Sequence, residues 1–501
     1  MLVLRLAPIA ILAAAIATPT SAAWQRATST HFIIYADQDP AGLSAFAQKL
    51  ERFDKAVRVT RAMADPPVGD GNRLTVFVVG GLLEVQRLQR GANNLTAGFY
   101  RTRASGSIAV VPRRMSRDTV LTPEIIFFHE YAHHLMFQEL SAPYPPWFVE
   151  GFAEFMSTAE VKADGSVGLG GAPVHRARSL YQRVNPLPFS SMLGAQAPTS
   201  GDERAALYAR GWLLAHYLTF SPTRRGQLEA YLSGIAAGRP PLDSARAAFG
   251  DLTALERDSE AYLKADKFPF LTIPAAQVPI APVKVAPVSP GMAATMPLMM
   301  RFRAGTDGND HAGLADRIRA SAAPFPADPM VQSLLAEAEL AAADPVAAEA
   351  AADRALAAQP DLVDAMLTKG RAILARAVAR KPGASFVDAR SWFTRANKVD
   401  SEDPEPLLLF YDAYRQEKVR PTANAIAALH YAADLAPQDL GLRLTNARQY
   451  LVDGKPVEAR KALVPLAYYS HGGKLSDEAR QLIGLIDSGQ VKAATIAPAT
   501  Q

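Results

Sequence analysis

The stretch His129-Glu130-Tyr131-Ala132-His133 sets two imidazoles four residues apart with a carboxylate between them. It lies inside a largely apolar run from Leu121 to Leu140, which predicts a buried helix. Because residues four apart share one face of a helix, His129 and His133 are placed to bind one metal ion. Glu130 is rotated by about 100° and can reach water bound to that metal. The alternative is a buried helix face with two ordinary histidines.

A second helix is predicted from Trp147 to Met156, with Pro145-Pro146 at its start. Glu150 and Glu154 share one of its faces, among aromatic side chains. Two buried carboxylates need partners, and a metal ion with a metal-bound histidine would supply them. The alternative is a solvated acidic face on an amphipathic helix.

With these two segments the sequence resembles the gluzincin zinc metallopeptidases, typified by thermolysin and aminopeptidase N. In that family a His-Glu-x-x-His helix is followed by a helix with an Asn-Glu-Gly-Phe-Ala-like run, and residues 149–153 read Val-Glu-Gly-Phe-Ala. The resemblance implies one Zn²⁺ per chain. Its ligands would be His129, His133 and Glu150. It also implies that Glu130 is the general base and that Glu154 orients a ligand histidine.

A further resemblance lies in the helical run from Arg204 to Phe220, which contains Tyr208-Ala-Arg-Gly211. This segment is similar to the Tyr-x-Lys-Gly segment of aminopeptidase N-like enzymes, so Tyr208 would stabilise the oxyanion. Gly211 would let this helix approach the zinc-bearing helix closely. His216 is the alternative oxyanion donor, because thermolysin-like members use a histidine, and its other reading is a buried structural residue.

The first part of the mature chain reads as α/β. Strands are predicted at 31–35 and 74–79, with a helix at 40–63 between them. A hairpin is predicted from strands 98–100 and 108–112, the last of which ends at a proline as edge strands can. A second hairpin is predicted between 161 and 169. In the resembled family, an edge strand beside the zinc pairs with an extended peptide.

Residues 268–300 hold seven prolines and read as an extended connector, so we expect weak coupling between the two halves of the chain. Alanine- and leucine-rich helices follow. Prolines at 329, 360, 404 and 437 recur at intervals of 31, 44 and 33 residues, which resembles tetratricopeptide repeats if residues 380–387 are an insertion. A generic helical bundle is the alternative.

Residues 1–23 have one positive charge, an apolar run and small residues at the end, which is typical of a secretory signal peptide. We therefore expect export to the periplasm or out of the cell. No later stretch approaches the roughly 18 apolar residues of a transmembrane helix. The chain has no cysteine, which excludes disulfides and thiolate ligands. Its net charge of +4 is not gathered into basic blocks, so nucleic-acid binding has no support.

Together these features predict an α+β zincin-like peptidase domain followed by an all-α, TPR-like helical-repeat domain. The predicted divisions are a signal peptide at 1–23, a peptidase domain at 24–267 with a mixed part at 24–118 and a mainly helical part at 119–267, the connector at 268–300, repeats at 301–490 and a tail at 491–501.

The predicted function is zinc-dependent hydrolysis of peptide or protein substrates, with the repeats binding a protein partner. No Gly-x-Met-Glu-Asn segment is present to hold a free N-terminus, so endopeptidase action is favoured over exopeptidase action. The alternative is a peptide-binding or scaffold protein whose peptidase-like domain is not catalytic. A third reading is a zinc hydrolase that acts on a non-peptide amide.

Overall fold

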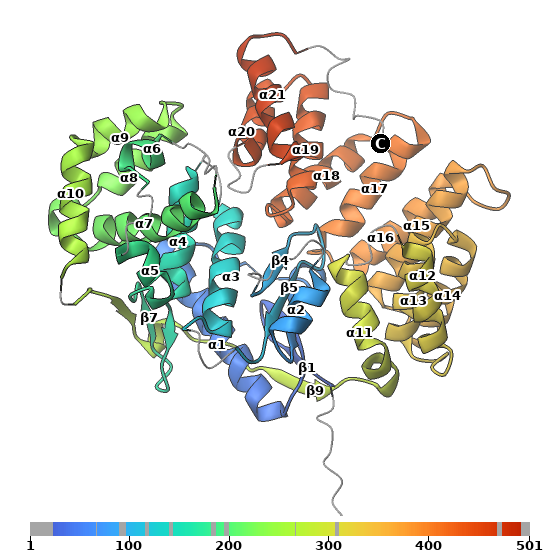
Figure 1. Ribbon diagram of the computed structural model, residues 1–501. Helices are drawn as coiled ribbons and strands as arrows, with labels where there is room; N and C mark the ends of the chain where they lie inside the picture. The colour runs from blue at the N-terminus through green and yellow to red at the C-terminus, as the bar shows by residue number, and fades with distance from the viewer. Residues whose placement is uncertain are drawn as a thin grey trace, which may run out of the picture.

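The computed structural model describes residues 24–66, 68–89, 97–115, 120–139, 144–181, 187–194, 200–265, 267–305, 310–467 and 473–491 (Figure 1). The predicted signal peptide lies outside these residues, as does all but the first residue of the predicted tail.

A mixed sheet of six strands lies at the centre of the molecule, in the order β4-β5-β3-β2-β1-β9 (Figure 1). The strands are β1 (Trp24–Thr28), β2 (Phe32–Asp37), β3 (Leu74–Val79), β4 (Phe99–Arg101), β5 (Ile108–Pro112) and β9 (Lys284–Pro287). β2, β3 and β5 run parallel, whereas β4, β1 and β9 pair antiparallel to their neighbours. The predicted hairpin is present, but its edge strand is β4. β5 lies inside the sheet beside β3, so the expectation of an edge strand at 108–112 is wrong.

Successive residues of each strand face opposite sides of the sheet, and helices cover both of these faces. On one side, Ile34 and Val76 pack with α1 (Pro40–Arg61) and α3 (Pro123–Glu139). On the other side, Tyr35 and Phe77 pack with α2 (Leu82–Leu88) and α11 (Pro290–Ala304). The sheet therefore has two separate apolar cores, one on each face.

Helices extend the first core away from the sheet. They are α4 (Pro146–Ser157), α5 (Ala177–Tyr181), α6 (Phe189–Leu193), α7 (Gly201–Phe220), α8 (Gln227–Ala236), α9 (Pro241–Phe249) and α10 (Leu252–Leu263). A small antiparallel sheet of β6 (Glu160–Val161), β7 (Val167–Leu169) and β8 (Leu271–Ile273) lies below them and contains the second predicted hairpin.

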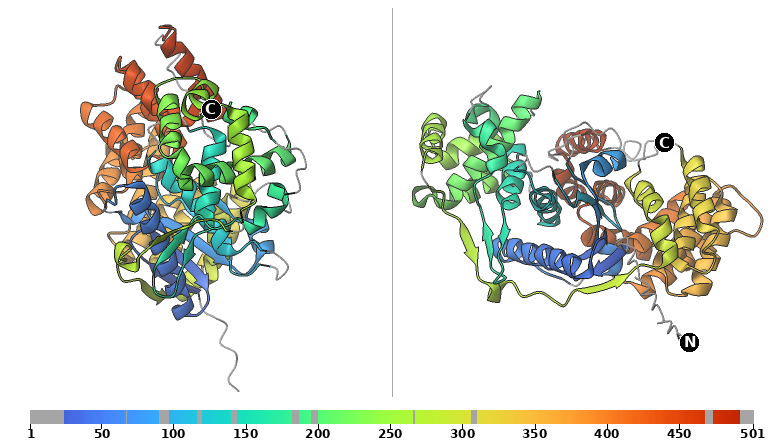
Figure 2. Two further views of the ribbon diagram at one scale, coloured as in Figure 1. Left: turned by 90° about the vertical axis from the view of Figure 1, so that its left-hand side faces the viewer. Right: turned by 60° about the horizontal axis from the view of Figure 1, so that its bottom comes forward.

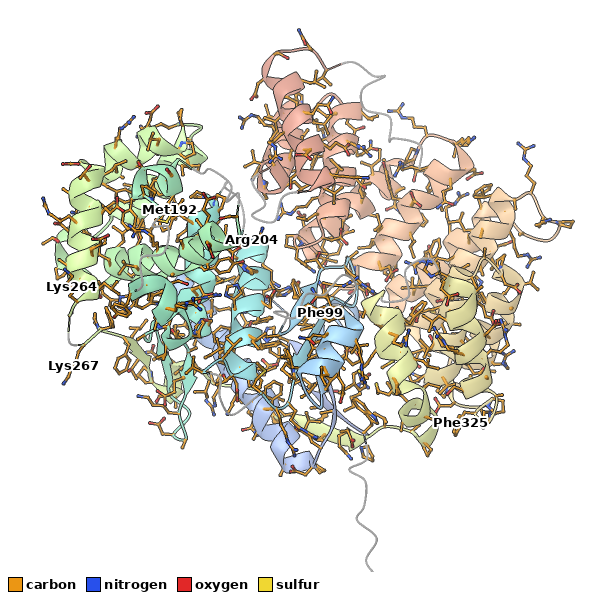
Figure 3. The ribbon with its side chains drawn as sticks, in the orientation of Figure 1. Phe99, Met192, Arg204, Lys264, Lys267 and Phe325 are labelled. Atoms are coloured by element: carbon orange, nitrogen blue, oxygen red, sulfur yellow. The ribbon has the colours of Figure 1, made fainter. Side chains whose placement is uncertain are left out.

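The proline-rich connector crosses the molecule. Figure 3 labels Lys264 and Lys267, where it begins, and Phe325 on the opposite side, beyond α11. In the right-hand view of Figure 2 the connector passes beneath α1 and joins the sheet as β9. The chain is helical from Pro290 onward, so the extended stretch ends ten residues before the predicted boundary at 300.

Antiparallel helices follow one another to the end of the described chain. They are α12 (His311–Ala322), α13 (Pro329–Ala341), α14 (Pro345–Ala358), α15 (Val363–Val378), α16 (Phe386–Val399), α17 (Pro404–Glu417), α18 (Ala423–Leu435), α19 (Leu440–Val452), α20 (Pro456–Ala467) and α21 (Lys474–Asp487). The odd-numbered helices from α13 on begin 34, 41, 36 and 34 residues apart, and each helix packs mainly on the next. Asp328 and Asp403 cap α13 and α17, and the prolines that follow them occupy the first helical position.

The sheet and the helical repeats share their packing. Met292, Met296 and Met300 of α11 form the second core together with the sheet strands. Ala104, in the turn between β4 and β5, packs against Tyr411 of α17, and the side-chain amide of Asn72 donates to the carbonyl of Leu435 at 2.7 Å. The prediction of a separate α+β domain is therefore wrong, and so is that of weak coupling between the halves.

Among the helices described, none combines the length and apolarity that crossing a membrane requires.

Candidate metal centre

Two neighbouring helices bring together three possible metal ligands. His129 and His133 project from α3, and Glu150 projects from α4, which packs beside it. The Nε2 atoms of the histidines lie 3.2 Å apart, and Oε2 of Glu150 lies 3.5 Å and 3.4 Å from them. All three ligand atoms thus converge on one point in a largely buried place.

This donor set fits a zinc ion. Zinc prefers tetrahedral nitrogen and oxygen ligands at about 2.0–2.1 Å, and such ligands lie about 3.3 Å from one another. The three separations agree with that spacing. Burial lowers the pKa of His129, but its hydrogen bonds with Glu150 and Glu154 outweigh burial and raise the pKa to about 10. The carboxylates around the centre therefore favour a positive charge between the three ligand atoms.

Glu154 lies behind the ligand His129, on the side of the ring that faces away from the other two ligands. It is fully buried, and its Oε1 lies 3.2 Å from Nδ1 of His129. Two further side chains contact it: His175 Nε2 lies 2.8 Å from Oε2, and Arg176 donates to Oε1 at 2.5 Å. Burial raises the pKa of Glu154, but these partners outweigh it and hold the pKa well below its usual range. Glu154 is therefore ionised and placed to orient His129.

A cavity of about 530 Å³ opens beside the ligands and is lined by His129, Glu130, Arg176 and Tyr208, among others. The phenol ring of Tyr208 stacks on the His129 ring with centroids 5.6 Å apart, and its hydroxyl hydrogen-bonds to Glu150. Burial and the charge of Glu150 raise the pKa of Tyr208, so the hydroxyl keeps its proton. The structure thus brings Glu130 and Tyr208 into the same cavity beside the ligands.

His216 lies in a different place. Its ring packs against aromatic residues that include Trp212 and Tyr262, with Nε2 bonded to the Gly170 carbonyl at 2.9 Å and Nδ1 to the Tyr262 hydroxyl at 2.8 Å. Burial lowers its pKa to about 4, so the ring is neutral. Both ring nitrogens hydrogen-bond to other residues of the core, as expected if His216 is a buried structural residue.

Two close glycines determine how α4 and α7 approach each other. A Cβ at Gly151 would lie 2.5 Å from the Gly211 carbonyl, and one at Gly211 would lie 2.6 Å from the Trp147 carbonyl. The helix backbones touch here, one residue from Glu150. Gly211 therefore lets α7 approach α4, which carries the third ligand, and this contact places Tyr208 at the centre.

His175 and Arg176 are functional candidates that sequence reasoning missed. They lie in a short 3-10 helix, and no spacing relates them to the ligand helices. Arg176 also lies over the Tyr208 ring at 4.9 Å. The one available signal was a histidine beside an arginine after the second predicted hairpin, which specifies no site by itself.

A second cluster of possible ligands lies behind α3. It contains His31, Asp54 and Asp65. Nδ1 of His31 lies 2.8 Å from Glu51, and Nε2 lies 3.0 Å from Asp65, so both nitrogens face carboxylates. Arg58 binds Asp54 at 2.8 Å, and Lys55 pairs with Asp65. Because these cations already neutralise the carboxylates, the cluster is an ion network, buried except at Asp65.

A repeat protein is among the solved structures that are similar to this chain. No family model matches the sequence, and no curated protein matches it. One similar solved structure is TTC0263, a thermophilic TPR protein of Thermus thermophilus, at 18% identity and a TM-score of 0.31, covering 40% of this chain and 97% of that chain. Another is a MamA RS-1 ArsTM double mutant, at 15% identity and a TM-score of 0.27, with the same coverages.

The family assignment is corrected, because no family model matches the sequence and the sheet shares its packing with the repeats instead of forming a separate domain. Membership of the gluzincins is wrong, as are the zincin fold class and the peptidase function that it implied. The physical reason is that residues 129–133 and 149–153 specify a local arrangement of ligands, and such an arrangement can be carried by more than one fold. Zinc binding and enzymatic activity are separate questions and stay predictions.

Proposed function

We propose that this chain is a protein-interaction protein that binds its partner on the helical repeats, and that its metal centre binds one zinc ion. The observation that carries the first part is the stack of helices from α12 to α21. Each helix packs mainly on its neighbours in the sequence, so the stack is extended and exposes much surface for its length.

Exposed valines mark one edge of this stack. They lie at the turns that join each odd-numbered helix from α13 to the next helix, and we call them the valine edge: Val346, Val378, Val387, Val419, Val452 and Val457. In a regular array of stacked helix pairs, equivalent turns lie along the same side. A row of exposed apolar side chains in a repeat array favours protein contact.

Substitution of the valine edge tests this proposal. The full chain and a Val387→Asp/Val457→Asp variant would be purified from the native host, and their bound proteins compared by quantitative mass spectrometry. We expect a specific partner to be lost from the variant while circular dichroism stays unchanged. The matched control is Leu83→Asp, which places a charge at a 69% exposed leucine of α2. Equal recovery of every protein by the variant and the full chain would contradict the proposal.

The convergent geometry of His129, His133 and Glu150 supports the zinc ion. Purified protein should contain one zinc per chain by inductively coupled plasma mass spectrometry, and His133→Ala or Glu150→Ala should abolish it. Glu130→Gln is the control, because Glu130 lines the cavity without belonging to the ligand cluster. Full zinc in Glu150→Ala would contradict this ligand set.

A second candidate function is zinc-dependent hydrolysis of a non-peptide ester or amide, favoured by the placement of Glu130 and Tyr208 in the cavity beside the ligands. When bound, zinc supplies a Lewis acid and lowers the pKa of a coordinated water. Glu130 would accept a proton in the cavity, and the Tyr208 hydroxyl would donate a hydrogen bond to developing negative charge.

The test of this candidate uses a library of chromogenic esters and amides. Turnover should disappear on chelation and in Glu130→Gln, although that variant keeps its zinc. Tyr208→Phe should keep both zinc and packing and should lose about 10²–10³ in turnover. Hydrolysis that persists in Glu130→Gln would exclude this mechanism.

A further inference from the structure

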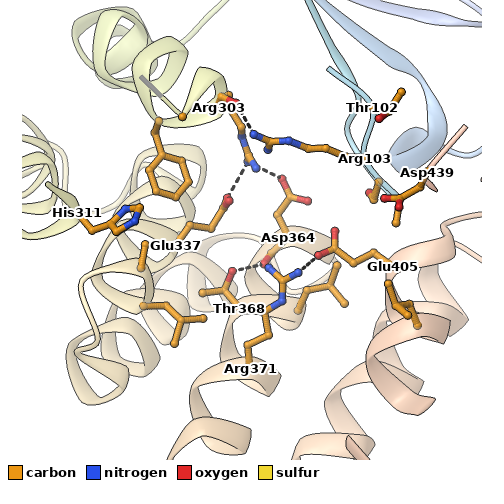
Figure 4. Close-up of a pocket in the computed structure, with 18 of the residues that line it drawn as sticks. Thr102, Arg103, Arg303, His311, Glu337, Asp364, Thr368, Arg371, Glu405 and Asp439 are labelled. Carbon is orange, nitrogen blue, oxygen red and sulfur yellow. Dashed lines mark hydrogen bonds and ion pairs between the residues drawn. The ribbon is translucent and has the colours of Figure 1, made fainter. Parts of the chain in front are cut away.

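A polar cavity of about 580 Å³ lies where the repeats meet the turn between β4 and β5. Figure 4 shows Arg103 entering it from that turn, opposite side chains from α11, α13, α15 and α17. The cavity is separate from the metal centre, and the two share no lining residue. It therefore needs an explanation of its own.

Charged side chains of alternating sign line the repeat side of the cavity. Arg303 of α11 donates to Glu337 of α13 at 2.7 Å and lies 3.6 Å from Asp364 at the start of α15. Farther along, Arg371 of α15 pairs with Glu405 of α17. These two arginines are thus neutralised by carboxylates of the cavity itself (Figure 4).

Arg103 differs from the other two arginines. Within the described chain its guanidinium makes one hydrogen bond, to the backbone carbonyl of Arg303, and no ion pair. Burial and the charge of Arg303 lower the pKa of Arg103, and the charges of Glu337 and Glu405 offset this only in part. A guanidinium has five N–H donors in a planar fork that matches a carboxylate. Arg103 is therefore the place in the cavity where an anionic group would be stabilised.

The occupant must be small, because the chain itself fills the neighbouring part of the repeat face. Ala104, next to Arg103, packs with Tyr411 and Leu429. The backbone of Gly71 bonds to Asp400 at 3.3 Å and accepts from Ser105 at 3.1 Å. A long extended peptide cannot run along the repeats through these contacts, whereas a short molecule or a chain end fits the cavity.

The wall that faces Arg103 would stabilise a cation. Glu337, Asp364 and Glu405 each pair with an arginine of the cavity, and an ionised carboxylate can accept hydrogen bonds from more than one donor. Burial raises the pKa of Glu337 to about 7. The three carboxylates share two arginines, Arg303 and Arg371, so an ammonium group near Asp364 and Glu405 would balance the remaining negative charge.

We propose that this cavity binds a small zwitterion, an amino acid or short peptide whose carboxylate pairs with Arg103 and whose ammonium lies near Asp364 and Glu405. The site needs both halves of the chain, since Arg103 comes from the sheet and the carboxylates come from the repeats. This inference goes beyond the proposed function, because it depends on neither the valine edge nor the zinc ion.

Isothermal titration calorimetry of the full chain with trialanine tests the inference. We expect binding that weakens about 10- to 100-fold in Arg103→Gln, because one charge-assisted pair is lost. N-acetyl-trialanine and trialanine amide should each bind more weakly than trialanine. The control is Arg480→Gln, an exposed arginine of α21, which should bind as the parent does.

Three outcomes would overturn it. They are no heat of binding at millimolar trialanine, binding of N-acetyl-trialanine as tight as that of trialanine, and binding of inorganic phosphate in preference to either. If Arg103→Gln fails to fold by circular dichroism, Asp364→Asn provides the same test from the other end of the ligand. Unchanged affinity for trialanine in that variant would equally contradict the assignment.

Discussion

At the scale of single residues, Glu154 is the side chain on which the metal centre most depends after the ligands. It is fully buried and contacts His129, His175 and Arg176. Glu154→Gln removes the charge but keeps the size, so His129 loses its ionic partner. We expect zinc affinity to fall by about 10- to 100-fold, with the stoichiometry restored at high zinc. Competition with a chromogenic chelator measures this affinity, and Glu160→Gln on exposed β6 should leave it unchanged. Parental affinity in Glu154→Gln would show that Glu154 does not orient a ligand.

His31 makes a second residue-scale prediction, which concerns pH. Burial and the charge of Arg58 lower its pKa. The carboxylates of Asp54 and Glu51 raise it by more, so the pKa lies above its usual value. The folded state therefore holds a proton that the unfolded state releases near its ordinary pKa of about 6.5. The stabilisation is fully present below that pH and is lost as pH rises through the raised pKa.

Urea unfolding between about pH 6 and pH 9 measures this effect. The free energy of unfolding of the parent should fall as pH rises across the window, relative to that of His31→Gln. The pKa of Glu51 is lowered, mainly by its bonds with His31, so its contribution to the free energy of unfolding is lost as pH falls. Identical slopes for the parent and His31→Gln would mean that His31 is neutral in the folded protein.

At the scale of elements, the contact of α4 with α7 holds the third ligand in place. Gly211→Ala would put a methyl group 2.6 Å from the Trp147 carbonyl. The helices must then separate, which should cost about 1–3 kcal/mol of stability and lower zinc affinity by displacing Glu150. Gly484→Ala is the control, because its site in α21 is open, and it should stabilise the helix by up to about 1 kcal/mol. Chemical denaturation measures both, and equal stability of the two variants would contradict the close contact.

The same elements show how far the sequence could be read. Helical spacing and proline positions predicted α3, α4 and α7 within a few residues, and the ligand residues on them meet as that spacing requires. The edge of the sheet was misjudged because a proline at 112 is equally compatible with the end of an inner strand. β9 was missed because its four residues pair with β1, more than 250 residues earlier, and local composition carries no signal of such pairing.

At the scale of the whole molecule, the sheet and the repeats form one structure. A chain that ends at Ala265 would lose β9, which covers the edge of β1, and the methionines of α11, which cover one face of the sheet. We expect that chain to expose apolar surface and to aggregate, in contrast to the independent folding that the proline-rich connector suggested. A chain that ends at Gly305 keeps both elements and should be the more soluble. Circular dichroism and size-exclusion chromatography decide, and a monomeric, cooperatively unfolding chain ending at Ala265 would restore the view of two weakly coupled halves.

The most direct measurement of the proposed function is hydrogen–deuterium exchange of the full chain, with and without the partner recovered through the repeats. If the repeats bind that partner, protection should appear at the turns of the valine edge, near Val346, Val387, Val419 and Val457. Residues of α3 and α4 should exchange at unchanged rates. Protection confined to residues 24–265, with the repeat turns unaffected, would contradict the claim that this chain acts through its repeats.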